Sequence, residues 1–122
     1  MTHLAAIGIV TRDVAESARF YRTLGLDVPQ PPADDHFEIT LPSGPRLMWD
    51  TVELIRQLEP EWTEPSGQRL SLAFECDVDA VYAELLAAGF AGKREPWDAF
   101  WGQRYAQVLD PDGNAVDLFR PL

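Results

Sequence analysis

The sequence predicts an α+β fold built from two similar halves. Each half begins with an apolar strand and an amphipathic helix, and strand-like segments broken by turns follow the helix. An offset of 64 residues brings five pairs into one register: Asp13 with Asp77, Val14 with Val78, Tyr21 with Leu85, Gly25 with Gly89, and Leu26 with Phe90. Five matches in a single register indicate an internal duplication.

The first half should contain one helix followed by two strands. Residues 4–10 are apolar and partly β-branched, which favours a buried strand. Asp13 and Glu16 have the spacing of a capping box, and Gly25 stands where a left-handed helix end is expected, so we predict a helix between them. Further strands are predicted at 36–41 and 46–50, joined by a Pro-Ser-Gly-Pro turn.

The second half follows the same plan. An alternating strand at 70–76 leads to a helix that opens at Asp77 and ends at Gly89. Strands at 101–109 and 115–119 follow, joined by Asp-Pro-Asp-Gly-Asn, a strong turn signal. The segment around Trp97 is expected to be irregular.

A single domain should therefore span 1–122, with one module at about 1–58, a linker at about 59–68 and a second module at about 69–122. The linker is rich in Pro, Glu and Gly. A short helix is predicted at 51–58, where Asp50 and Glu53 again have capping-box spacing.

Charge and composition exclude several classes of protein. Ten Lys and Arg against twenty Asp and Glu give a net charge of −10, which disfavours nucleic acid or an anionic membrane as partner and suits a neutral or cationic one. The single cysteine excludes an internal disulfide framework and a Cys-based zinc site. The N-terminus lacks the features of a signal peptide, and no apolar run has the length of a membrane span, so we expect a cytoplasmic protein.

Motifs along almost the whole chain point to one family. They include Asp13-Val14, Phe20-Tyr21, Leu24-Gly25-Leu26, Leu72-Ala73-Phe74-Glu75, Tyr82-Ala83-Glu84-Leu85, Ala88-Gly89-Phe90, Asp110-Pro111-Asp112-Gly113-Asn114 and Asp117-Leu118-Phe119. This pattern resembles the vicinal-oxygen-chelate superfamily of glyoxalase I, extradiol dioxygenases and bleomycin-resistance proteins. The more specific run Trp101-Gly102-Gln103-Arg104-Tyr105-Ala106 resembles its mitomycin-binding, drug-sequestering branch. The resemblance implies two βαβββ modules whose mixed sheets curl into a cup, with helices on the outside, in a homodimer.

Enzymes of that superfamily bind a divalent metal ion with four His, Gln or Glu ligands. The resemblance places the four positions at Ala6, near Met48, at Ser71 (or Leu70) and at Asp117. Only Asp117 suits a hard cation, so we expect no metal site and no cofactor.

Strand alternation assigns the remaining faces. In the second module, alternate apolar residues should pack against the helices: Leu72, Phe74, Cys76, Ala106, Val108, Val116 and Leu118. The opposite face then carries aromatic, amide and carboxylate groups, which suit a flat polar ligand. The predicted ligand-binding residues are Phe37, Glu38, Met48, Asp50, Trp97, Trp101, Gln103, Tyr105 and Asp117.

Several of these residues have other interpretations. Trp101 suits the core or a dimer contact as well as a stacking wall, and Asp50 suits a helix cap as well as a ligand contact. Tyr105 is equally suited to a cross-strand hydrogen bond. Trp49 and Trp62 are interpreted as structural, His36 as a solvated lone histidine, and Cys76 as buried and inert.

The leading hypothesis is a metal-free protein that sequesters a small planar aromatic or quinone-like compound and so confers resistance to an antibiotic. The alternative is a glyoxalase-like enzyme that uses acid–base chemistry through Glu38, Asp50, Glu75 or Asp117 without a metal. A third is a protein-interaction role on the same scaffold. The sequence favours binding over catalysis, because no nucleophile–base set is visible.

Overall fold

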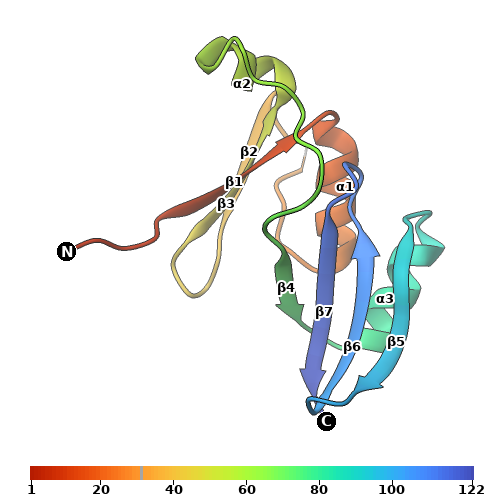
Figure 1. Ribbon diagram of the computed structural model, residues 1–122. Helices are drawn as coiled ribbons and strands as arrows, with labels where there is room; N and C mark the ends of the chain where they lie inside the picture. The colour runs from red at the N-terminus through yellow and green to blue at the C-terminus, as the bar shows by residue number, and fades with distance from the viewer. Residues whose placement is uncertain (31) are drawn as a thin grey trace. The chain divides into compact units, whose positions relative to one another are not determined.

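The computed structural model describes residues 1–30 and 32–122. It consists of two compact units, one formed by Met1–Arg22 with Leu26–Pro65 and the other by Thr23–Gly25 with Ser66–Leu122. Each unit contains a mixed β-sheet and a long helix (Figure 1). The predicted α+β class with two related modules is confirmed, and no helix in the described part of the chain has the length and apolar character needed to cross a bilayer.

The first unit contains three strands, a short helix and most of a long helix. Its elements are β1 (Ala6–Thr11), α1 (Val14–Leu24), β2 (His36–Thr40), β3 (Arg46–Thr51) and α2 (Val52–Leu58). The sheet order is β1-β3-β2, with β1 parallel and β2 antiparallel to β3. In the described residues, the order of elements in the first unit is strand, helix, strand, strand, helix, and the short helix α2 comes last.

An aromatic cluster forms the core of the first unit. Strand register places Phe37 opposite Trp49, and their rings stack with centroids 4.5 Å apart and planes 9° apart. Tyr21 of α1 contacts the same indole at 4.7 Å. All three side chains are buried. Helix α1 therefore covers the sheet face that carries Trp49.

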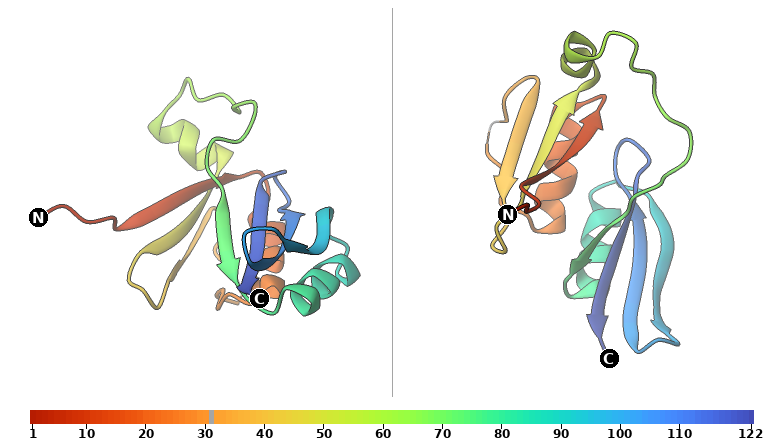
Figure 2. Two further views of the ribbon diagram at one scale, coloured as in Figure 1. Left: turned by 60° about the horizontal axis from the view of Figure 1, so that its bottom comes forward. Right: turned by 60° about the vertical axis from the view of Figure 1, so that its left-hand side comes forward.

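The second unit is a complete βαβββ module. Its elements are β4 (Leu72–Glu75), α3 (Val78–Ala87), β5 (Gly92–Ala99), β6 (Gln103–Leu109) and β7 (Ala115–Pro121). The order is β4-β7-β6-β5, with β4 parallel to β7, and α3 packs along one face of this sheet (Figure 2). Of the predicted helix-facing set, Ala106, Val108, Val116 and Leu118 are buried, whereas Leu72 and Phe74 on β4 are partly exposed.

The duplication is visible in how the two long helices end. Leu26 N–H donates to the carbonyl of Tyr21 at 3.0 Å, and Phe90 N–H donates to the carbonyl of Leu85 at 3.0 Å, so the two bonds join residues related by the 64-residue offset. Each bond closes around a glycine with positive φ, 121° at Gly25 and 94° at Gly89.

The starts of the helices match as well. The Oδ1 atom of Asp13 accepts the N–H of Glu16 at 3.1 Å, and that of Asp77 accepts the N–H of Ala80 at 3.4 Å. Both predicted N-caps are confirmed. The Glu16 carboxylate, however, pairs with Arg19 at 3.0 Å, so the reciprocal half of the predicted capping box gives way to an ion pair within the helix.

The third predicted cap was wrong. The residue that caps α2 is Thr51, whose Oγ1 accepts the N–H of Leu54 at 3.1 Å. Asp50 lies one residue earlier, inside β3, where it pairs with β2. A hydroxyl and a carboxylate side by side both fit the N-cap preference, and the length of β3 decides between them.

Several predicted strand limits also change. Residues 92–99 form β5 where an irregular segment was expected, and Trp101 lies in the turn before β6. The strands β1 and β4 begin two residues later than predicted, because Leu4 and Leu70 lie outside the ladders, with 63% and 79% exposure. Cys76 follows the predicted alternation but is partly exposed rather than buried.

Candidate functional site

The face of the second sheet that points away from α3 carries two cross-strand rows of side chains. One, the aromatic row, consists of Trp97 on β5, Tyr105 on β6 and Phe119 on β7, which are register partners. The other, the polar row, consists of Arg94, Gln107 and Asp117 on the same three strands. Antiparallel register thus brings residues from three segments of the chain onto one surface.

The rings of Trp97, Trp101 and Tyr105 surround a common corner of this face. Their centroids are 5.3–6.1 Å apart, and their planes meet at 68–89°. These are edge-to-face contacts, the arrangement that aromatic quadrupoles favour. Trp101 is 49% exposed although it makes both contacts, so much of its indole remains open to solvent. Its Nε1–H donates to Oε1 of Gln103 at 2.8 Å, which fixes the indole.

Asp117 connects the two rows. Its carboxylate accepts the hydroxyl of Tyr105 at 2.6 Å and the amide N–H of Gln107 at 3.0 Å. Burial, together with the hydrogen bond to Asp117 and the charge of that carboxylate, raises the pKa of Tyr105 to about 12. Tyr105 is therefore a neutral phenol near pH 7. The predicted cross-strand hydrogen bond is confirmed, and Tyr105 lies on the sheet face opposite α3, as alternation predicts.

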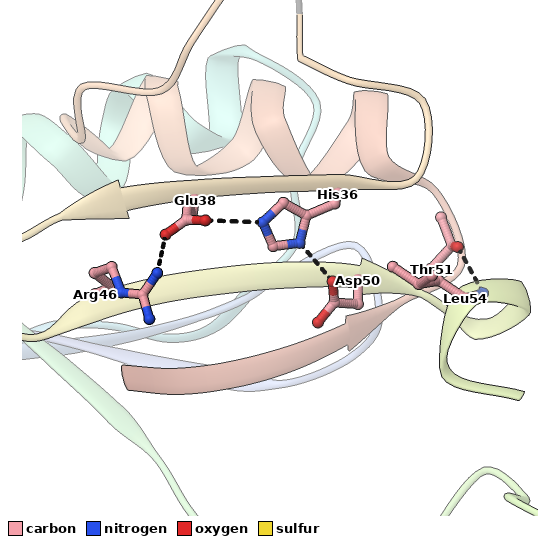
Figure 3. A network of polar contacts seen from close by, with 6 residues as sticks. All are labelled: His36, Glu38, Arg46, Asp50, Thr51 and Leu54. Atoms are coloured by element: carbon pink, nitrogen blue, oxygen red, sulfur yellow. Dashed lines mark hydrogen bonds and ion pairs between the residues drawn. The ribbon is translucent and has the colours of Figure 1, made fainter. Parts of the chain in front are cut away.

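A second polar cluster lies in the first unit, on the face of β2 and β3 that points away from Trp49 (Figure 3). His36 Nδ1 bonds Oδ1 of Asp50 at 2.5 Å, and its Nε2 bonds Oε1 of Glu38 at 3.1 Å. Arg46 Nη1 donates to the other oxygen of Glu38 at 2.7 Å. Met48 is the register partner of Glu38 on the same face. We call His36, Glu38, Arg46 and Asp50 the charge chain.

The charge chain shifts the protonation of its members. The hydrogen bond to Asp50, and then that to Glu38, raise the pKa of His36 above 6.5 against the effect of burial. The bonds from His36 and Arg46 hold the pKa of Glu38 below its ordinary 4.5. The interpretation of His36 as a solvated lone histidine was therefore wrong: both ring nitrogens have carboxylate partners. The signal in the sequence was that His36 and Glu38 are two residues apart on a predicted strand, which places their side chains on the same face.

The predicted ligand-binding residues fall into three groups. Trp97, Trp101, Gln103, Tyr105 and Asp117 lie together on the second unit. Glu38, Met48 and Asp50 lie together on the first unit's polar face. Phe37 is brought together with neither group, because alternation turns it to the opposite face of β2, where it is 3% exposed against Trp49. The sequence prediction did not include Arg94, whose guanidinium lies 3.6 Å from the centre of the Trp97 ring.

The divalent metal of the superfamily's enzymes does not fit these side chains. Ala6 and Met48 offer a methyl and a thioether at two of the four implied positions. The Asp117 carboxylate has both oxygens engaged by Tyr105 and Gln107. Across residues 1–30 and 32–122, no three His, Cys, Asp or Glu side chains come together in a way that could hold a metal ion.

Comparison with known proteins identifies the family to which a chain with this fold belongs. A model of the glyoxalase/bleomycin resistance protein/dioxygenase superfamily matches residues 2–118. The chain belongs to that superfamily, which is the broad resemblance that the sequence motifs indicate. No curated protein matches the chain significantly.

Solved structures repeat the fold over the full chain. A glyoxalase/bleomycin resistance protein/dioxygenase family enzyme from Burkholderia phytofirmans PsJN is 21% identical, with a TM-score of 0.84 over 99% of this chain and 100% of that one. A glyoxalase-related enzyme from Fulvimarina pelagi is 22% identical, with a TM-score of 0.82 over 98% of this chain and 88% of that one. A Nocardioides glyoxalase/bleomycin resistance protein/dioxygenase is 26% identical, with a TM-score of 0.75 over 100% and 85%.

Proposed function

We propose that this protein binds and sequesters a small planar aromatic or quinone-like compound, without metal and without chemical turnover, in the manner of the drug-resistance members of its superfamily. The observation that carries the proposal is the half-exposed indole of Trp101, held at an angle to Trp97 and Tyr105 on one sheet face. When a flat ligand stacks on an exposed, fixed aromatic surface of this kind, the contact makes the free energy of binding more favourable.

The polar groups around the rings support a ligand that is polar as well as flat. Gln103 fixes the Trp101 indole, and Asp117 fixes the Tyr105 hydroxyl, so neither ring needs to be ordered on binding. Preorganisation of this type lowers the entropic cost of association. The amide groups of Gln103 and Gln107 also retain hydrogen-bonding capacity with which to orient a ligand.

The place of the first unit in binding stays a prediction. Glu38, Met48 and Asp50 share a polar face, and Met48 is the partly buried apolar side chain among them. Replacing Met48 by Ala tests their contribution, since it leaves the charge chain intact. Phe37 is buried in the core and forms no part of the proposed binding surface.

A second candidate is acid–base catalysis without metal, and the charge chain favours it. His36 lies between two carboxylates and has a raised pKa, which suits a group that donates a proton near neutral pH. Against this, both ring nitrogens are already bonded within the chain, so His36 must leave one partner before it reaches a substrate.

Native mass spectrometry distinguishes the two candidates. The protein is incubated separately with mitomycin C, with bleomycin and with a simple naphthoquinone. The compound is then released from each complex and its mass is measured. Sequestration predicts a complex with an unchanged compound. A compound returned with altered mass, in a reaction abolished by His36→Gln, would instead establish the enzyme. Absence of any complex or turnover with all three would count against both.

We also propose that the chain acts as a homodimer, as the family resemblance implies. Sedimentation velocity over a hundredfold range of concentration tests this, and a monomer throughout contradicts it. The expectations of a cytoplasmic location, and of no nucleic-acid or membrane partner, stay predictions.

A further inference from the structure

We propose that Arg94 is a ligand-binding residue that recognises a carboxylate, or a similar planar oxyanion, on the compound bound at Trp97, Trp101 and Tyr105. This inference rests on the proposed function and adds the chemical class of the ligand: a flat aromatic acid. It makes Arg94 a specificity-determining residue.

Two irregularities in β5 place Arg94 on the ligand face. Gly92 pairs with Val108 and Arg94 with Gln107, so two steps on β5 match one step on β6. Trp97 then pairs with Tyr105, so three steps on β5 match two on β6. In a regular strand, residues 94 and 97 would point to opposite faces. The extra residue between them turns both to the same face, and bulges that redirect a side chain in this way are frequent next to functional sites.

Trp97 holds the Arg94 guanidinium in a defined position. The guanidinium carbon lies 3.6 Å from the indole centre, well within the range of a cation–π contact. Stacking on the indole engages the flat face of the guanidinium and leaves the N–H groups at its edge available. Those N–H groups form the fork that matches a carboxylate with two parallel hydrogen bonds.

Arg94 has no hydrogen-bonding or ion-pair partner among residues 1–30 and 32–122, although the chain carries twenty acidic residues. Other arginines do have carboxylate partners: Arg46 pairs with Glu38 at 2.7 Å, and Arg104 pairs with Asp79 at 2.8 Å and Asp98 at 3.2 Å. The unpaired guanidinium thus lies beside exposed aromatic rings, where a bound anion would satisfy it.

The nearest carboxylate in the polar row does not neutralise Arg94. Asp117 lies on β7, two strands from β5, which is about 10 Å between backbones at ordinary strand spacing. Its oxygens already accept hydrogen bonds from Tyr105 and Gln107. The distant charges that make up the net −10 are screened over about 8 Å at physiological ionic strength. Within the polar row, Arg94 therefore carries the charge that no neighbouring side chain of the row engages.

The test compares three probes that share one flat ring system: anthraquinone-2-carboxylate, anthraquinone-2-carboxamide and 2-(aminomethyl)anthraquinone. Affinities are measured by quenching of tryptophan fluorescence in about 0.15 M NaCl, where distant charges are screened. Because a hydrogen bond to a charged group is stronger than a neutral one, we expect the carboxylate to bind about tenfold or more tighter than the carboxamide. The ammonium probe should bind most weakly.

Variants assign this preference to a residue. Arg94→Gln should abolish the preference for the carboxylate and leave the affinity for the carboxamide within about threefold of the wild-type value. Arg94→Lys should keep part of the preference, because lysine retains the positive charge but lacks the forked N–H groups of the guanidinium. Lys93→Gln, which removes the same charge from the neighbouring exposed residue, should keep the full preference. Circular dichroism and melting temperature establish that each variant is folded.

The outcomes separate the inference from the proposed function. If carboxylate and carboxamide bind the wild type equally, if the ammonium probe binds best, or if Arg94→Gln keeps the preference, the inference is overturned while binding of planar compounds stands. If none of the three probes binds, the proposed function fails for this face and the inference fails with it.

Discussion

The two sheet faces differ in how completely their charged groups are paired and in how much aromatic surface they expose. In the first unit, the charge chain joins carboxylates to His36 and Arg46, so each charge has a partner within the sheet. In the second unit, Trp101 is half exposed and Arg94 stacks on Trp97 with no hydrogen-bonding partner in the described part of the chain. The comparison favours the second sheet face as the proposed binding surface, because the fold leaves half of the Trp101 side chain exposed and the Arg94 guanidinium without a hydrogen bond to the described residues there.

The two faces also differ in where their tryptophans lie. Trp49 belongs to the core side of the first sheet and is fully buried, whereas Trp101 lies in the turn between β5 and β6. A buried indole contributes to stability through packing. An indole in an exposed turn contributes little to folding and is free to contribute to binding.

The largest expected effect separates these two indoles. Trp49→Ala should lower the free energy of unfolding by about 3–5 kcal/mol, because it empties a packed site between Tyr21 and Phe37. Trp101→Ala should cost clearly less, since half of that side chain is already in water. Urea denaturation of both variants measures the difference. Equal losses would make Trp101 a core residue and remove the contrast between the two units.

Trp49→Phe sharpens the same comparison. The Nε1–H of Trp49 is buried without a hydrogen-bond partner in the described part of the chain, and such a group is costly. Phenylalanine keeps a ring against Phe37 and removes that donor. It should therefore cost less than alanine in the same urea experiment.

A smaller effect concerns Tyr105 at alkaline pH. Because its pKa is raised to about 12, the folded state retains the phenol proton more strongly than the unfolded state, whose tyrosine pKa is near 10. Its contribution to stability is fully present below pH 10 and is lost as the pH rises towards 12. The difference between the ultraviolet titration curves of the wild type and of Tyr105→Phe should show a tyrosine that ionises near pH 12. A difference spectrum that titrates near pH 10 would contradict the bond to Asp117.

The charge chain should give a weaker, two-sided pH dependence in the first unit. The raised pKa of His36 makes its contribution complete below 6.5 and lost as the pH rises through the raised value. The lowered pKa of Glu38 makes its contribution complete above 4.5 and lost as the pH falls through the lowered value. The difference between the melting temperature of the wild type and that of His36→Gln should therefore be greatest between about pH 4.5 and 6.5. A difference that does not vary with pH would show that the chain is not coupled to folding.

The smallest expected effect is that of metal ions. With Asp117 already hydrogen-bonded and Ala6 and Met48 at two of the other family positions, added zinc, nickel or magnesium should leave the melting temperature unchanged. One tightly bound ion per chain in elemental analysis would contradict this.

Local chemistry made much of the fold predictable. Asp13 and Asp77 are effective caps because their carboxylates accept nearby N–H groups, and the sequence shows them directly. Strict alternation also predicts that Tyr105 and Asp117 share one face, and the structure joins them there by a hydrogen bond.

The remainder depended on register, which a single sequence does not display. Alternation assumes a regular strand, so the irregularities in β5 concealed both the strand itself and the shared face of Arg94 and Trp97. The pairing of β2 with β3 gave His36 its second carboxylate and turned Phe37 into the core. Each of these outcomes required knowing which residues lie opposite each other across a sheet.

Binding of a planar aromatic compound to Trp101→Ala and Trp62→Ala tests the central claim most directly. Trp101→Ala removes a stacking surface worth about 1–3 kcal/mol, so affinity should fall by about one to two orders of magnitude. Trp62, whose backbone carbonyl accepts a hydrogen bond from Arg56 and whose ring lies 5.9 Å from its guanidinium, provides a control that should leave affinity nearly unchanged. Stability is measured in parallel. If folded Trp101→Ala binds as tightly as the wild type, the second sheet face is not the binding surface.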